Sequence, residues 1–140
     1  MIVKVVMPMV KNNKMVPYHA SSVRVAQEIT ADCETPYAKY KKVTEYITRH
    51  FVYDFVRAIQ IPKKNGMPDI ARTWTYKMGI CLDLASLTTG MLRGIGLDAK
   101  MCIGKADGSP HAWVETRING KKYRYDRVGR AKVYKTERTY

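Results

Sequence analysis

The stretch Gly79-Ile80-Cys81-Leu82-Asp83-Leu84-Ala85 places a cysteine where a turn passes into a helix. The run His111-Ala112-Trp113-Val114-Glu115 begins thirty residues after this cysteine, and Asp126 follows fifteen residues after the histidine. A thiol at a helix start, a histidine and a later carboxylate are the side chains that a cysteine nucleophile uses with its base and its orienting acid. The order of these residues predicts an enzyme.

The bulk composition is that of a folded globular protein. The chain has 140 residues, of which 46% are hydrophobic, which is enough for one domain with its own core. We expect residues 1–20 to form a strand followed by an irregular arm, and residues 21–140 to form a single catalytic domain. We expect that domain to be monomeric.

The charge is strongly positive and unevenly distributed. Lys and Arg number 25 against 12 acidic residues, a net charge of +13, and residues 117–140 hold nine of the basic side chains but only two acidic ones. Such an excess favours contact with polyanions, such as nucleic acid, an anionic membrane surface or an anionic cell wall. For residues 117–140 we favour a solvated strand face followed by a basic tail, and a dedicated anion-binding surface is the alternative.

The cysteines predict neither a disulfide framework nor a zinc site, because Cys33, Cys81 and Cys102 are odd in number and form no C-x-x-C pair. A Cys33–Cys102 bridge that leaves Cys81 free is the alternative to three separate thiols. No calcium loop of the D-x-D-x-D-G kind is present. We therefore expect no metal and no cofactor.

The hydropathy pattern contains no run of 18 apolar residues, so no membrane span is predicted. Residues 1–10 lack the charged region, apolar region and cleavage site of a signal peptide. We expect a secreted or cell-surface protein, after removal of a leader, in preference to a cytoplasmic one.

Apolar residues at helical spacing predict two helices in the first part of the chain. The first covers about residues 21–30, with Ser21 and Ser22 as candidate caps. The second covers residues 36–53, with Thr35 as its cap. Its buried face is predicted to be the stripe Tyr40, Val43, Ile47 and Phe51.

A loop and a third helix are predicted next. Residues 60–72 contain Pro62, Gly66 and Pro68 and are expected to form the loop. Residues 81–93 are expected to form the helix that begins at the cysteine, with Gly94 as its C-cap.

From residue 97 the apolar period changes from helical spacing to two. Alternation over residues 97–103 and 111–118 predicts two half-buried strands, and Asn119-Gly120 predicts a tight hairpin into a third. Helices followed by an antiparallel sheet make the fold class α+β, with N-terminal helices packed on a C-terminal sheet.

The hairpin also predicts which side chains share a face of the sheet. With Asn119-Gly120 as a two-residue turn, Glu115 lies opposite Arg124 and Trp113 opposite Asp126. His111 then lies on the same face as Asp126, one diagonal step away and within side-chain reach. The sequence therefore predicts a His–Asp pair.

These residues suit thiol chemistry. A helix N-terminus and an imidazolium both stabilise a thiolate, so Cys81 is the candidate nucleophile and His111 its base. Asp126 would orient the imidazole. The Cys81 N–H is a candidate oxyanion donor, and Trp74 or Tyr76 is the candidate for a second. Trp113, beside the histidine, is a further candidate for substrate contact.

Each of these residues also has a structural interpretation. A cysteine that begins a buried helix can serve packing alone, a histidine on a strand can be structural, and Asp126 can be a surface acid among basic neighbours. The combination of ordered spacing with a shared sheet face favours the catalytic interpretation.

Three segments resemble the transglutaminase-like core: GICLDLASLTTGMLRGIGLDAKMCIG (79–104), HAWVE (111–115) and YD (125–126). The segment KVTEYITRHFVYD (42–54) is similar to the helix that precedes this core. The resemblance covers about residues 36–130 and implies a papain-like α+β fold with Cys81, His111 and Asp126 as its triad. Arg127-Val128 depart from the Asp-Pro-Thr that often follows the last strand residue in the family.

The resemblance implies a cysteine peptidase, amidase or transamidase that acts on a protein or peptide through a thioester. Hydrolysis is favoured over cross-linking for a domain this small. Two alternatives remain. One is a catalytically silent basic module with the same fold that binds a cell wall, a protein or a nucleic acid. The other is a dedicated nucleic-acid binder, although no stacking motif or recognition helix is present.

Overall fold

A computed structural model describes residues 14–60, 67–129 and 131–140. The predicted strand in residues 1–10, and Pro62 and Gly66 of the predicted loop, lie outside these ranges. The elements of the described chain are α1 (Ala20–Ile29), α2 (Pro36–His50), β1 (Val52–Tyr53), α3 (Phe55–Gln60), α4 (Ile70–Tyr76), β2 (Met78–Gly79), α5 (Cys81–Gly94), β3 (Asp98–Ala106), β4 (Ser109–Ile118), β5 (Lys121–Tyr125) and β6 (Tyr134–Thr139).

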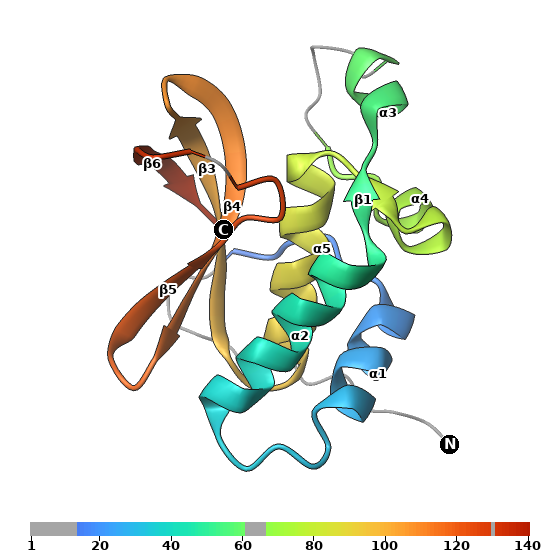
Figure 1. Ribbon diagram of the computed structural model, residues 1–140, viewed down its shortest axis with the longest axis vertical. Helices are drawn as coiled ribbons and strands as arrows, with labels where there is room; N and C mark the ends of the chain where they lie inside the picture. Colours follow the sequence, from blue (N-terminus) through green and yellow to red (C-terminus); the bar gives the residue numbers. More distant parts are fainter. Residues whose placement is uncertain (1–13, 61–66, 130) are drawn as a thin grey trace.

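Helix α5 lies at the centre of the molecule, between the sheet and the helices α1, α2 and α4 (Figure 1). Every residue from Asp83 to Gly94 is buried. The predicted stripe on α2 is buried against the same core, as are Leu84, Leu87 and Met91 of α5. A helix that is buried all round must satisfy its polar groups internally, and Thr88 and Thr89 do so by donating to the carbonyls of Leu84 and Ala85.

The sheet confirms the predicted α+β class. Its strand order is β5-β4-β3-β6, and all three pairings are antiparallel. Asn119 and Gly120 form the tight turn between β4 and β5, with φ of 52° and 79°. This turn sets the predicted register, in which Ile118 pairs with Lys121 and Glu115 with Arg124.

The first two helices differ from the prediction at their ends. The cap of α1 is His19, whose Nδ1 accepts from Ser21 N at 3.1 Å, so the serines lie inside the helix. Helix α2 begins as predicted but ends at His50, not at Tyr53. Val52 N donates to Lys77 O at 3.1 Å instead, because residues 52–53 form a parallel pair with β2.

The predicted loop over residues 60–72 is wrong at its end, because α4 begins at Ile70. Asp69 caps this helix by accepting from Arg72 N at 3.1 Å. Helix α3 lies immediately before the predicted loop and had no clear signal in the sequence.

Gly94 is not the C-cap of α5 but its last helical residue, and Ile95 is the cap. A Cβ on Gly94 would lie 2.4 Å from Val23 Cγ1 of α1, so the missing side chain lets the two helices pack closely. The left-handed residue after the helix is Gly96, with φ of 89°.

Residues 134–139 form strand β6, so the predicted basic tail is wrong here, whereas the largely exposed β6 agrees with the predicted solvated strand face. Strand β6 pairs with β3 at the edge of the sheet, with a register shift between Ile103 and Gly104. A Cβ on Gly104 would lie 2.0 Å from Lys135 O, so glycine permits this close approach. Cys102 of β3 is fully buried.

Arg93, near the end of α5, is a buried cation whose hydrogen bonds go to backbone carbonyls. Its Nε donates to Ala99 O at 2.8 Å, Nη1 to Lys14 O at 2.9 Å and Nη2 to Tyr140 O at 2.8 Å. Burial lowers the pKa of this guanidinium, while Asp98 acts in the opposite direction.

Gly94→Ala is expected to destabilise the protein. Overpacking lowers the free energy of unfolding by about 1–3 kcal/mol. The better helix propensity of alanine raises it by about 1 kcal/mol at most. Urea unfolding would measure the loss.

Val23→Ala supplies the matched control, because it removes the Cγ atoms that the new methyl group meets. In that background Gly94→Ala should cost less, which a double-mutant cycle detects as coupling. An equal cost in both backgrounds would show that contact with Val23 is not what requires glycine.

Candidate active site

The first turn of α5 is fixed by the buried carboxylate of Asp83. Its Oδ2 accepts from Ile80 N at 2.9 Å and from Arg57 Nε at 2.7 Å. Its Oδ1 accepts from Asp69 N at 2.8 Å and from Arg57 Nη2 at 3.0 Å. These four bonds join the helix start to α3 and to the cap of α4, so the position of the first residue, Cys81, is set from several directions.

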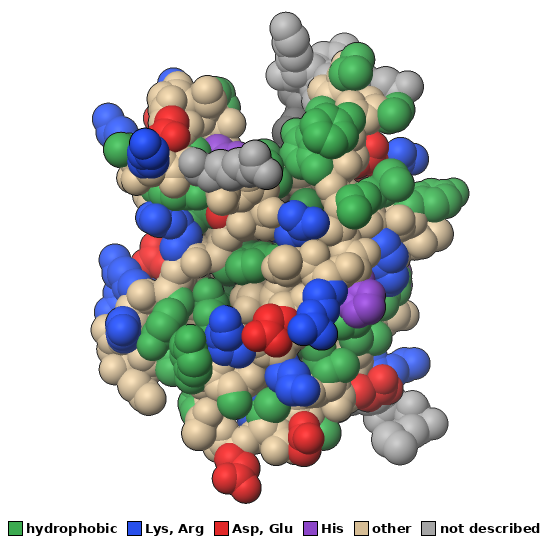
Figure 2. Space-filling view, in the orientation of Figure 1, with side chains coloured by type: hydrophobic (Ala, Val, Ile, Leu, Met, Phe, Trp, Pro, Cys, Tyr) green, Lys and Arg blue, Asp and Glu red, His purple; other side chains and the backbone are tan. Residues whose placement is uncertain are grey.

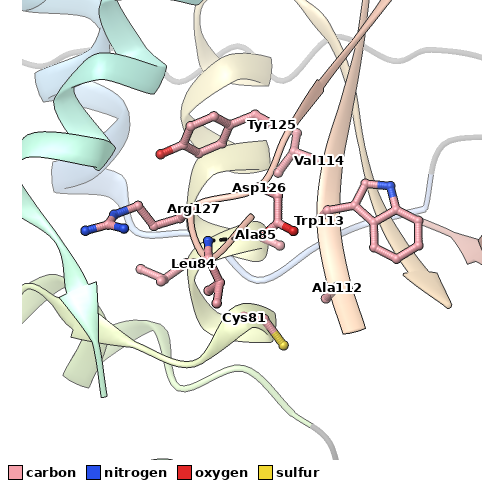
Figure 3. Close-up of a pocket in the computed structure, with 10 residues that line it drawn as sticks. Cys81, Leu84, Ala85, Ala112, Trp113, Val114, Tyr125, Asp126 and Arg127 are labelled. Carbon is pink, nitrogen blue, oxygen red and sulfur yellow. Dashed lines mark hydrogen bonds between the residues drawn. The ribbon is translucent and has the colours of Figure 1, made fainter. Parts of the chain in front are cut away.

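Cys81 is a free, partly exposed thiol at the N-terminal end of α5. Figure 3 shows its sulfur pointing away from the helix, on the side of Ala112 of β4. The first N–H groups of a helix have no intrahelical acceptor and carry partial positive charge. The sulfur therefore lies at the end of the helix where the partial charge is positive.

His111 and Asp126 come together as the hairpin register predicts. His111 Nε2 lies 2.7 Å from Asp126 Oδ2, and the two side chains are only 14% and 6% exposed. The paired residues of β4 and β5 end at Val114 and Tyr125, so Asp126 is the first residue past the ladder. With Nε2 bound to the carboxylate, Nδ1 is the ring nitrogen left for the thiol.

The electrostatics favour an imidazolium at His111. Hydrogen bonds to Asp126 and then to Cys81 raise its pKa from 6.5 to about 10, against the opposing effect of burial. Burial raises the pKa of the Asp126 carboxyl, but hydrogen bonds from His111 and Tyr134 outweigh it and hold that pKa below its ordinary value. The pair is thus a charged one at neutral pH.

The other candidates from the sequence occupy different surroundings. Trp74 stacks on His19 and carries Lys77 Nζ 3.1 Å from its ring centroid. Tyr76 is 62% exposed and lies beside Arg72. Among the described contacts, none joins either side chain to Cys81. Trp113 is buried next to His111, with ring centroids 6.2 Å apart.

Two tyrosines near the site were not singled out from the sequence. Burial raises the pKa of Tyr53, and the charges of Cys81, Asp83 and Asp54 add to this rise. Tyr53 pairs across the β1–β2 ladder with Gly79, which lies two residues before Cys81 in the sequence. The second is Tyr134, whose hydroxyl donates to Asp126 Oδ2 at 2.7 Å. The parallel pairing and the last strand had no clear signal in the sequence.

The space around the three residues is unequal. A cavity of about 10 Å³ lies between the start of α5 and the sheet, which is barely the volume of one water. A hollow of about 600 Å³ is lined by Tyr53, Phe55, Arg127, Val128 and Gly129. Another of about 270 Å³ lies beside His111 and Asp126. A substrate therefore has room on the outer side of the site and none behind it.

Candidate sites other than the Cys81, His111 and Asp126 group have less support in the described residues. The three cysteines are free, and burial raises the pKa of the Cys102 thiol to about 12. No group of three potential metal ligands occurs in the part of the chain that the structure describes. Within the same residues, no helix is long and apolar enough to cross a bilayer. Basic side chains are scattered over the face seen in Figure 2, with acidic ones between them.

Three solved structures share the fold. A candidate cysteine protease from Cytophaga hutchinsonii aligns with a TM-score of 0.63 and 22% identity over 79% of this chain and 38% of its own. A candidate protease from Parabacteroides distasonis aligns with a TM-score of 0.58 and 16% identity, over 74% of this chain and 22% of its own. A TGase aligns with a TM-score of 0.54 and 21% identity, over 84% of this chain and 32% of its own.

Curated relatives match over a short segment. The centrosomal proteins of 76 kDa from Mus musculus and Homo sapiens are 54% identical over 39 residues, which is 27% of this chain. The chain covers 6% of the length of each of these relatives.

One protein family matches most of the chain. The model of the transglutaminase-like superfamily aligns with residues 23–127, which include the start of α5, the β4–β5 hairpin and Asp126. The solved structures agree with that fold. The chain therefore belongs to the transglutaminase-like superfamily.

Proposed function

We propose that this protein is a cysteine-dependent enzyme that acts on amide bonds of proteins or peptides. The observation that carries the proposal is the His111–Asp126 pair at 2.7 Å, with the Cys81 thiol near enough to add to the rise in the pKa of the same imidazole. A structural histidine needs neither a charged partner on one side nor a partly exposed thiol at a helix N-terminus on the other.

The geometry supports a separate proposed role for each of the three residues. In the resting ion pair the thiol proton already lies on His111, and Cys81 attacks the substrate carbonyl as a thiolate. His111 returns the proton to the departing amine, which leaves a thioester on Cys81. Asp126 holds the ring so that Nδ1 faces the sulfur, and its charge stabilises the imidazolium during the step.

The oxyanion that forms during attack needs donors near the sulfur. The Cys81 N–H is one, because helix geometry leaves it without an intrahelical acceptor. We favour Tyr53 as the second in place of Trp74 or Tyr76, because its pKa responds to the charge on Cys81. Its register opposite Gly79 also places it beside the chain that leads into α5.

The substrate is proposed to lie on the outer side of the site. The hollow walled by Tyr53, Phe55 and Val128 is partly apolar, and it would receive a side chain of the acyl donor. Water as acceptor completes hydrolysis, and a lysine amine completes transamidation. We favour hydrolysis, because a small and open site gives water free access to the thioester.

The second candidate is a basic module that binds a partner without turnover. The net charge of +13 and the match to a centrosomal protein, whose name denotes no enzyme, favour it. The basic residues of β5 are partly engaged within the protein, since Lys122 pairs with Glu115 at 3.3 Å and Lys121 lies over the Tyr123 ring.

Cys81 is expected to be alkylated by iodoacetamide at pH 6 at least about tenfold faster than Cys33 or Cys102. An ordinary thiol with a pKa near ~8.5 is almost fully protonated at that pH, whereas an ion-paired thiolate is not. The His111 pKa of about 10 implies that the fast reaction persists across neutral pH. Mass spectrometry of each cysteine peptide measures the rates.

His111→Gln is the control for the alkylation, because it removes the imidazolium and should abolish the preference for Cys81. Equal rates at the three cysteines in the native protein would contradict the activated thiolate.

Turnover separates the two candidate functions. Native protein incubated with dimethylcasein and a fluorescent primary amine should release fragments by hydrolysis or incorporate the amine, and Cys81→Ala should do neither. Cys33→Ala, which alters a thiol outside the site, should retain activity. No turnover by the native protein, combined with heparin binding that is equal in native and Cys81→Ala proteins, would favour the silent module.

A further inference from the structure

The Asp126 carboxylate stands outside the pairing that orders the sheet. The β4–β5 ladder ends one residue earlier, at Tyr125, so sheet hydrogen bonds do not fix the backbone of Asp126. Its Oδ1 accepts from Val128 N at 3.1 Å, which holds one oxygen locally. The other oxygen, Oδ2, is the one that His111 uses.

Oδ2 has a second donor from a distant strand. Tyr134 is the first residue of β6, at the opposite edge of the sheet from β5. Its hydroxyl donates to Oδ2 at 2.7 Å, equal to the distance from His111 Nε2 to the same atom. The two donors come from β4 and β6, so two strands that both flank β3 define the position of this oxygen.

The Tyr134 ring is itself held in place. The Arg124 guanidinium carbon lies 3.7 Å from the ring centroid, and Trp113 meets the ring edge to face at 5.0 Å. Trp113 also packs against His111. One tyrosine therefore contacts the orienting acid through its hydroxyl and, through its ring, the tryptophan that supports the base.

The start of β6 is fixed by the turn before β4. The Asp107 carboxylate accepts from Lys132 N at 3.0 Å and from Val133 N at 2.8 Å, and Val133 O accepts from Asp107 N at 2.8 Å. Tyr134 then pairs with Ala106. This anchoring directly before Tyr134 sets the direction in which its side chain leaves the strand.

We propose that Tyr134 is a positioning residue, whose hydroxyl holds the Asp126 carboxylate in the orientation that keeps Oδ2 on His111 Nε2. The proposal rests on the function proposed above. Without the hydroxyl, the Val128 N–H would be the one described donor to the carboxylate besides His111. Rotation about the side-chain bonds of Asp126 would then break the bond to His111 in part of the molecules.

A phenol suits this role because it donates without adding charge. Burial and the hydrogen bond to Asp126 raise the Tyr134 pKa to about 12, so the hydroxyl keeps its proton throughout the neutral range. The charges that act on this tyrosine are Asp126, Arg124 and Asp107, and those that act on His111 are Cys81 and Asp126. Tyr134→Phe changes none of these charges.

The test is the titration of His111 in protein that carries Cys81→Ala, followed by NMR of the imidazole. This background removes the thiol, so the pKa of His111 reports its bond to Asp126 and does not depend on catalysis. Adding Tyr134→Phe should lower that pKa by about one unit, because part of the molecules lose the ion pair. Adding Tyr123→Phe, which removes a hydroxyl from the cluster with Tyr37 and Tyr40, should leave it unchanged.

In protein with Cys81 intact, Tyr134→Phe should slow alkylation of Cys81 at pH 6 by about three- to tenfold, and Tyr123→Phe should not. An unchanged or higher His111 pKa in Tyr134→Phe overturns the positioning role, even if the variant melts at a lower temperature. If native protein showed no turnover but Tyr134→Phe still lowered the His111 pKa, the enzymatic function would be contradicted and the positioning role of Tyr134 would stand.

Discussion

The complete burial of α5 is the constraint on which the rest of the structure depends. From Asp83 to Gly94 the helix meets protein on every side, so small residues must stand where Tyr18 and Val23 approach it, at Gly90 and Gly94. Its polar side chains must find acceptors within the protein. A helix held this firmly presents its first residue at one fixed place, beside the sheet.

The sheet positions the other two side chains, His111 and Asp126, through the pairing of its strands. A tight hairpin turn fixes the register of β4 and β5, and register decides which side chains share a face. The candidate site therefore forms where a buried helix end meets the face of a sheet. Cys81 and His111 lie on these two ordered elements, whereas Asp126 directly follows the last paired residue of β5.

Local signals predicted what local forces determine. The start of α5, Thr35 as the cap of α2 and the Asn119-Gly120 turn depend on residues close in sequence, and so does the meeting of His111 with Asp126. Long-range pairing decided the rest. Val52 and Tyr53 leave the helix to pair with β2, and Tyr134 reaches Asp126 across the sheet. Gly94 resembles a cap in the sequence, and only the approach of α1 shows its packing role.

The hydrogen bonds of Arg93 have a consequence for how the chain folds. One guanidinium joins carbonyls of Lys14 and Tyr140, which lie 79 and 47 residues away from it in sequence. If the segment at Lys14 or at Tyr140 detached, this buried cation would lose one of its three carbonyl acceptors. Opening at the ends is therefore coupled to opening of the centre, which favours all-or-none unfolding over gradual fraying. Such distant partners also slow folding, because the entropy of closing long loops must be lost before these bonds can form.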